Sequence, residues 1–112
     1  MTCLTLPYPP SANVYWRRHG NVIHRSAEAT AYKEAAGWIC RTAGLQPVTG
    51  DVRVWLSFYR PAKRGDLDNL LKVTIDSLIG FAYEDDSQIV EIHATRHEDK
   101  HAPRVEIVVE AA

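Results

Sequence analysis

The sequence predicts an α+β fold, in which one domain spanning residues 1–112 folds as a mixed β-sheet with two helices packed on it. Two segments, 51–60 and 88–99, alternate apolar and polar residues with the period of a strand. Two others, 27–44 and 67–80, repeat apolar residues at helical spacing. The predicted order of elements is strand, hairpin, helix, strand, helix, strand, strand.

The amino-terminal third predicts an extended strand followed by a hairpin. A short apolar run leads into Pro9 and Pro10, which stiffen the chain in an extended course. The stretches "NVYWRR" and "NVIHR" flank His19-Gly20-Asn21, and this tripeptide predicts the turn because Gly and Asn tolerate positive φ.

The first helix is expected to start after Ser26, a good N-cap residue, and to end at Gly44. Its Ala-rich sequence has an apolar stripe at helical spacing, which we assign to Ala31, Ala35, Trp38 and Ile39.

The following strand, 51–60, ends before Pro61 and has an inward face of Val52, Val54, Leu56 and Phe58. Its other face carries Trp55 and Tyr59, which predicts partial burial on both sides. The second helix is expected over Leu67–Gly80, with an inward stripe of Leu67, Leu70 or Leu71, Thr74 and Leu78. A loop "FAYEDDSQ" then leads into the strand at 88–99, whose inward residues are predicted to be Val90, Ile92 and Ala94, and "RVEIVVEA" forms the last strand.

Composition excludes several classes of protein. The apolar fraction of 46% is that of a globular chain, and no apolar run approaches the roughly 20 residues of a membrane span. The start "MTCLTLPYPP" does not read as a signal peptide. Cys3 and Cys40 lie far apart, which favours a reduced, cytosolic setting.

Charge is divided unevenly along a chain whose net charge is −1. Residues 1–64 carry nine Lys or Arg against three acids, whereas residues 65–112 carry four against eleven. This asymmetry is a hint of a charged partner such as nucleic acid.

The stretch "KRGDLDNLLK", residues 63–72, has two interpretations. In the first, Asp66 or Asp68 is a helix N-cap, and Asp68, Lys72 and Asp76 form a ladder of charges on the exposed helix face. In the second, the two carboxylates converge at the helix N-terminus and hold Mg²⁺, which prefers oxygen ligands, while Lys72 meets a phosphate oxygen one turn later.

A second acidic cluster, "YEDDSQ", precedes the strand at Gln88. A solvated acidic turn is one interpretation. Alternatively, the loop returns along the second helix and places one aspartate beside Asp66 and Asp68. The spacing of the residues leaves both open.

The pattern "RGDLDNLLKVTIDSLIGFAYEDDSQIV", residues 64–90, resembles the RusA family of bacterial and phage crossover-junction endodeoxyribonucleases. So do "LPYPPSANVYWR" and "HRSAEATAYK", and the resemblance covers nearly the whole chain in order. It implies a homodimer that acts in DNA recombination and repair and nicks four-way (Holliday) junctions in a metal-dependent reaction. A cytoplasmic, nucleoid-associated setting follows.

The resemblance also implies roles for individual residues. The catalytic aspartates and metal ligands of the family match Asp66, Asp68 and Asp86, and its essential lysine matches Lys72. Asp85 matches a secondary acidic position. We expect Mg²⁺, with Mn²⁺ as a substitute, to activate a water that hydrolyses the phosphodiester.

Branched DNA would be bound mainly through its phosphates, and the principal candidates are Arg17, Arg18, Lys63 and Arg64. Further candidates are Arg25, Lys33 and Arg60. Tyr15, Trp16 and Tyr83 are candidates for stacking on opened bases; the alternative is that they belong to the core, as aromatics at such positions more often do. The outward aromatics of the strand at 51–60 and the last strand are both candidate dimer surfaces.

The histidines do not follow the spacing of zinc ligands. His93 and His97 share the polar face of a strand, and His101 follows in a turn, so we interpret all three as solvated residues.

Two alternatives to a junction nuclease stay open. One is a catalytically silent protein that binds branched DNA. The other is a phosphohydrolase that uses Asp66 as a nucleophile, a chemistry that usually occurs on larger doubly wound folds.

Overall fold

The computed structural model describes residues 2–10, 16–19, 22–62 and 67–112, with the backbone alone given for 16–19 and 22–25. Its elements follow the predicted order. The strands are β1 (Thr2–Pro7), β2 (Trp16–His19), β3 (Val22–Arg25), β4 (Val52–Arg60), β5 (Ile89–Glu98) and β6 (Arg104–Ala111). The helices are α2 (Ala27–Thr42), α3 (Leu67–Leu78) and the short 3₁₀ helix η1 (Asp86–Gln88). The predicted α+β fold is confirmed, and the described residues form two α-helices, as predicted.

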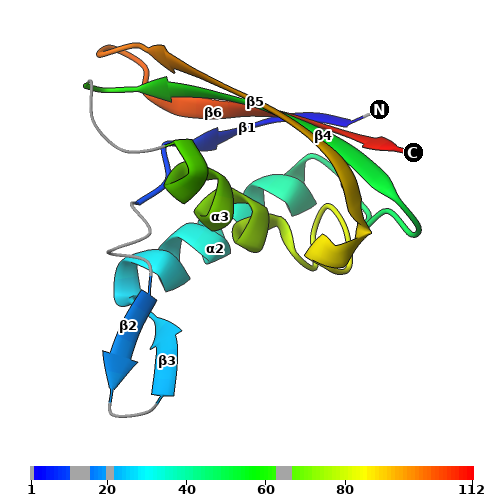
Figure 1. Cartoon of the computed structure of the whole chain (residues 1–112), viewed down its shortest axis with the longest axis horizontal. Coiled ribbons are helices and arrows are strands. Elements are labelled where there is room, and N and C mark those ends of the chain that lie inside the picture. Colours follow the sequence, from blue (N-terminus) through cyan, green and yellow to red (C-terminus); the bar gives the residue numbers. More distant parts are fainter. Residues whose placement is uncertain (1, 11–15, 20–21, 63–66) are drawn as a thin grey trace.

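The main sheet is mixed and has the strand order β1-β6-β4-β5. Strand β6 pairs antiparallel with both β1 and β4, whereas β4 and β5 are parallel and connected through α3. Both helices lie on one face of this sheet, and the β2–β3 hairpin lies beyond α2, away from the sheet (Figure 1). In the part of the chain that the structure describes, no α-helix covers the other face of the sheet (Figure 1).

Strand β4 confirms the predicted alternation. Val52, Val54, Leu56 and Phe58 are all buried and face the helices. Trp55 and Tyr59 on the opposite face are half-buried. Because side chains of a strand alternate between the two faces of its sheet, β4 contributes both to the core and to the outer surface.

Helix α2 begins as predicted, since the Ser26 hydroxyl accepts a hydrogen bond from the Ala29 N–H at 3.2 Å. Its buried face differs from the prediction. The helix buries Ala29, Tyr32, Ala36, Gly37 and Cys40, whereas the indole of Trp38 is 69% exposed. The stripe that faces the core is therefore one residue out of phase with the predicted one.

Helix α3 buries the face that the sequence predicts, including Leu70, Thr74 and Leu78. The Thr74 and Ser77 hydroxyls donate to carbonyl oxygens four residues earlier, so these polar groups are satisfied inside the core. Neither described α-helix has the length and apolar character that crossing a bilayer requires.

Strand β5 corrects the prediction of its inward face. Val90 is 57% exposed, because the pairing of β4 with β5 shifts between Val52 and Arg53 and leaves Val90 as an extra residue. Ile92 is 46% exposed although it lies on the helix side of the strand. It lines a pocket beside α3, at the edge of the sheet.

Candidate active site

Helix α3 presents Asp68, Lys72 and Asp76 along one face, because residues four apart in a helix are neighbours on its surface. Asp68 and Lys72 are exposed, and Asp76 is half-buried. The helix therefore arranges acid, base and acid in a row that begins in its first turn.

This row forms one wall of a pocket of about 460 Å³. Its charged lining residues are Asp68, Lys72, Asp76 and Asp86, and its apolar ones are Leu71, Ile75 and Ile92. The loop before β5 therefore brings Asp86 to the same pocket as Asp68 and Lys72. Glu84, Asp85 and Asp86 are all exposed, as the solvated-turn alternative expects, while Asp86 also lines the pocket. A position of Asp86 beside Asp66 stays a prediction, because Asp66 lies outside the described residues.

Asp85 and Asp86 have different surroundings although they are adjacent. Asp85 is the N-cap of η1, and its carboxylate accepts hydrogen bonds from both the backbone N–H and the hydroxyl of Ser87. These hydrogen bonds from Ser87 lower the pKa of the Asp85 carboxyl. Asp86 lines the pocket. Asp85 thus shapes the turn that presents Asp86.

Tyr83 attaches this loop to the helix. Its ring is fully buried, and its hydroxyl donates a hydrogen bond to the Ile75 carbonyl oxygen at 2.7 Å. Burial is the main cause that raises the pKa of Tyr83, and the nearby carboxylates of Asp86 and Asp76 raise it further. Of the two alternatives for Tyr83, the structure confirms the core and excludes stacking on DNA bases, because the ring is fully buried.

Several predicted site residues lie outside what the structure describes. Asp66, Lys63 and Arg64 fall in the segment 63–66, and Tyr15 falls in 11–15. The β2–β3 hairpin contains Trp16, Arg17, Arg18 and Arg25, and only its backbone is described. Their predicted roles stay predictions.

Two of the further DNA-contact candidates have other functions in the fold. Arg60 is only 6% exposed, and its guanidinium pairs with Glu98 at 3.3 Å. The Lys33 ammonium donates to the carbonyl oxygens of Asp76 and Ile79 at the end of α3. The prediction of a surface phosphate contact is therefore wrong for Arg60, which is buried, whereas for the half-buried Lys33 it stays a prediction.

Within the described residues, no three side chains of His, Cys, Asp or Glu group closely enough to hold a metal ion. Helical rise alone separates Asp68 from Asp76 by about 12 Å. Asp68 and Asp86 line one pocket, but the described residues alone do not form a metal-binding group there.

The site prediction did not include Asp76, although its position four residues after Lys72 and eight after Asp68 indicated the shared helix face. It also did not include Ile92, which was expected in the core. The spacing of the residues gave no sign that Ile92 lines a pocket. Its exposure depends on how much of β5 is covered by α3, which is a matter of tertiary packing.

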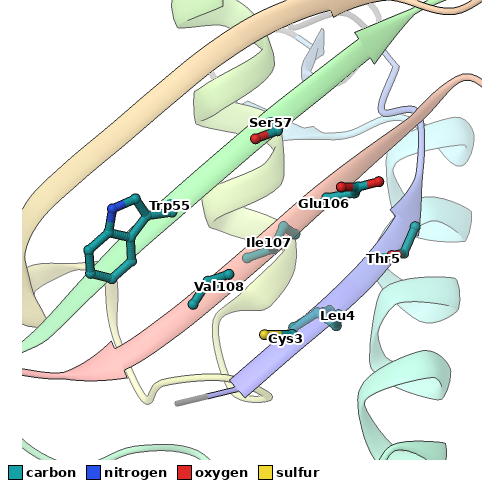
Figure 2. Close-up of a pocket in the computed structure, with 8 residues that line it drawn as sticks. All are labelled: Cys3, Leu4, Thr5, Trp55, Ser57, Glu106, Ile107 and Val108. Atoms are coloured by element: carbon teal, nitrogen blue, oxygen red, sulfur yellow. The ribbon is translucent and has the colours of Figure 1, made fainter.

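A second, smaller hollow of about 340 Å³ lies on the sheet face opposite α2 and α3 (Figure 2). Figure 2 shows Cys3 on β1, Trp55 and Ser57 on β4, and Glu106 and Val108 on β6 around it. Beside it, the Trp55 and Tyr59 rings stack on His93 and His97. The lining of this hollow has one carboxylate, that of Glu106, and no lysine or arginine. The first pocket, in contrast, combines a lysine with three carboxylates.

The fold and the first pocket define a small α+β protein with a pocket lined by three carboxylates and a lysine. The profile of the family described as Endodeoxyribonuclease RusA matches residues 7–110. The crossover junction endodeoxyribonuclease rusA of Enterobacteria phage HK97 is 42% identical over 95 residues, covering 81% of this chain and 78% of that protein.

The corresponding proteins of Escherichia coli strain K12 and Enterobacteria phage 82 are 34% and 33% identical over 110 residues. Each alignment covers 95% of this chain and 91% of the relative. The chain therefore belongs to the RusA family.

Proposed function

We propose that this chain is a metal-dependent endodeoxyribonuclease that resolves four-way DNA junctions by paired symmetric nicks. The observation that carries the proposal is the pocket that joins Asp68, Lys72 and Asp86 from two separate segments of the chain. Relatives that align over most of the chain are named crossover junction endodeoxyribonucleases. Those relatives come from phages and bacteria, so we place the activity in the bacterial cytoplasm, with the nucleoid.

The donor set of the pocket fits Mg²⁺, with Mn²⁺ as a substitute. Mg²⁺ takes oxygen ligands and in phosphate-processing sites is commonly held by one or two carboxylates, with water and substrate phosphate oxygens completing the shell. Asp68 and Asp86 supply carboxylates to the pocket, and we assign Asp66 as the third ligand. A metal bound there would neutralise charge on the scissile phosphate and lower the pKa of a water molecule.

Side chains of the protein would stabilise the transition state and hold the metal ion. Lys72 is one helical turn from Asp68, and its ammonium would offset negative charge that develops on the phosphate in the transition state. Asp68 and Asp86 would act on the phosphate only through the metal ion that they hold, because carboxylates alone repel it. This arrangement requires no covalent bond to the enzyme.

Two symmetric cuts need two sites, so we propose a homodimer whose two-fold axis matches that of the junction. Arg17, Arg18, Lys63 and Arg64 would hold the DNA through its phosphates, and binding should weaken steeply as salt rises. The mass of the protein in solution, measured by light scattering, tests the dimer.

The experiment that tests the activity uses a labelled synthetic four-way junction and a linear duplex of the same sequence, each with and without Mg²⁺. We expect paired nicks in the junction only, and only with the metal. Asp68→Asn and Asp86→Asn should each abolish cleavage and retain junction binding. Asp51→Asn, an exposed aspartate outside the pocket, is the matched control.

Cleavage by Asp68→Asn in Mg²⁺ would overturn the site assignment. Tight junction binding without cleavage by the unmodified protein would instead identify a catalytically silent DNA-binding protein.

A further inference from the structure

The side chain of Gln88 makes hydrogen bonds with all of its polar groups, and every partner is backbone. Its amide oxygen accepts from the N–H groups of Glu84 and Asp85 at 2.7 and 2.9 Å. Its amide nitrogen donates to the carbonyl oxygens of Val48 and Gly50 at 2.8 and 2.7 Å. A planar amide that has two acceptor and two donor positions is thus fully used.

These four bonds join two loops that are distant in sequence. Glu84 and Asp85 belong to the acidic loop before β5, whereas Val48 and Gly50 belong to the connection between α2 and β4. The Val48 N–H also donates to the Ala82 carbonyl oxygen at 3.0 Å, so the connection is attached to both ends of the acidic loop. Gln88 therefore holds the loop against a fixed part of the fold.

Asp86 lies inside the segment that Gln88 holds. It is the first residue of η1, between the N-cap Asp85 and Gln88 at the third position. The backbone N–H of Gln88 also donates to the Asp85 carbonyl oxygen at 3.2 Å. Asp85 and Gln88, which flank the turn containing Asp86, are thus both fixed by hydrogen bonds, while Asp86 lines the pocket.

From this geometry we infer that Gln88 is the positioning residue for Asp86: it sets the place of that carboxylate in the pocket without touching substrate or metal. The inference rests on the proposed function. Residues that orient metal ligands typically change metal affinity or activity by about 10–100-fold when they are replaced.

Gln88→Glu is the sharpest variant, because it keeps the shape and the acceptor oxygen and replaces the donor amide by a carboxylate oxygen. That oxygen would face the carbonyl oxygens of Val48 and Gly50 and repel them. Gln46→Glu makes the same chemical change at an exposed position of the neighbouring connection and serves as the control.

The readout is Mn²⁺ binding by calorimetry, together with the Mn²⁺ concentration at which junction cleavage is half-maximal. We expect Gln88→Glu to weaken Mn²⁺ binding by about 10–100-fold and to raise the half-maximal concentration equally. Excess Mn²⁺ should restore cleavage by Gln88→Glu but not by Asp86→Asn. Gln46→Glu should match the unmodified protein.

A second measurement needs no variant. Hydrogen exchange of the Glu84 and Asp85 amides in the unmodified protein should be slow, because both donate to Gln88, and exchange at the rate of an open loop would overturn the inference.

If Gln88→Glu lowers only the free energy of unfolding and leaves the Mn²⁺ requirement unchanged, Gln88 is merely structural and the inference fails. If the unmodified protein neither binds Mn²⁺ nor cleaves the junction, the proposed function fails and the inference fails with it. Mn²⁺ binding and cleavage by the unmodified protein distinguish the two failures: both activities are present if only the inference fails, and both are absent if the proposed function fails.

Discussion

The Lys33 ammonium on α2 donates a hydrogen bond to the Asp76 carbonyl oxygen on α3 at 2.8 Å. It also donates to the Ile79 carbonyl oxygen at 3.1 Å, just beyond the end of α3. The last carbonyl oxygens of a helix lack partners within the helix and carry partial negative charge, so a lysine there is stabilising. One side chain thus caps the helix that bears Asp68 and Lys72 and ties it to α2.

Lys33→Met should therefore lower the free energy of unfolding by about 1–2 kcal/mol, because the methionine keeps most of the apolar stem but leaves two carbonyl oxygens without the ammonium. Urea unfolding followed by circular dichroism measures this loss. Lys100→Met, at an exposed position between β5 and β6, should change stability by less than about 0.5 kcal/mol. Equal losses in both variants would contradict the capping role.

The Phe81 ring packs directly against the backbone of Gly37, where no side chain intervenes. A Cβ at position 37 would lie 2.5 Å from Phe81 Cζ, and the Lys33 and Arg41 side chains flank the same ring, 5.4 and 5.8 Å from its centroid. Gly37→Ala should destabilise the protein by about 1 kcal/mol, since the cost of overpacking exceeds the gain in helix propensity.

The sign should reverse once the ring is removed. In a Phe81→Ala background, Gly37→Ala should stabilise the protein by about 0.5–1 kcal/mol, because only the propensity gain is left. A double-mutant cycle from denaturant unfolding checks both values. The same sign in both backgrounds would show that the ring does not limit position 37.

Lys72→Met should slow junction cleavage by about 10²–10³-fold, the usual effect of removing one group that stabilises transition-state charge. Its effect on junction binding should be small, because a single phosphate contact is a minor part of the total. Single-turnover cleavage at saturating enzyme separates the chemical step from binding. A variant that loses affinity and keeps its rate would place Lys72 in DNA binding alone.

Ser87→Ala should raise the pKa of the Asp85 carboxyl toward its ordinary value, because the hydroxyl hydrogen bond is the main cause that lowers it. A depressed pKa means that this interaction stabilises the fold above the unfolded pKa, near 3.9, and is lost as pH falls through the folded pKa. The stability difference between variant and parent should therefore disappear in acid. A carboxyl carbon NMR titration measures the shift directly, and an Asp85 titration that is identical in both proteins would contradict it.

The sequence predicted the fold where one physical signal dominates. Strict alternation in β4 and the Ser26 cap of α2 both appear as expected. The buried stripe of α2 was predicted one residue out of phase because the helix is rich in alanine. With so little contrast between neighbouring positions, two adjacent stripes fit the helical period, and tertiary packing selected Tyr32 over Trp38.

The helical part of the candidate site could be predicted from the sequence, but the part on the loop could not. Asp68 and Lys72 share a helix face by spacing alone, whereas the approach of Asp86 depends on the path of a loop. That path is fixed by bonds between residues far apart in sequence, such as those from Gln88 to Val48 and Gly50. The periodicity of the sequence carries no information about such contacts.

The position of β6 within the sheet has a consequence for biosynthesis. This strand lies between β1 and β4, yet it is translated after both. Until it leaves the ribosome, β1 and β4 have no central partner, so the nascent chain cannot close its sheet. A message cut short before codon 104 would therefore yield a polypeptide that carries every acidic residue of the pocket but cannot complete the sheet that supports it.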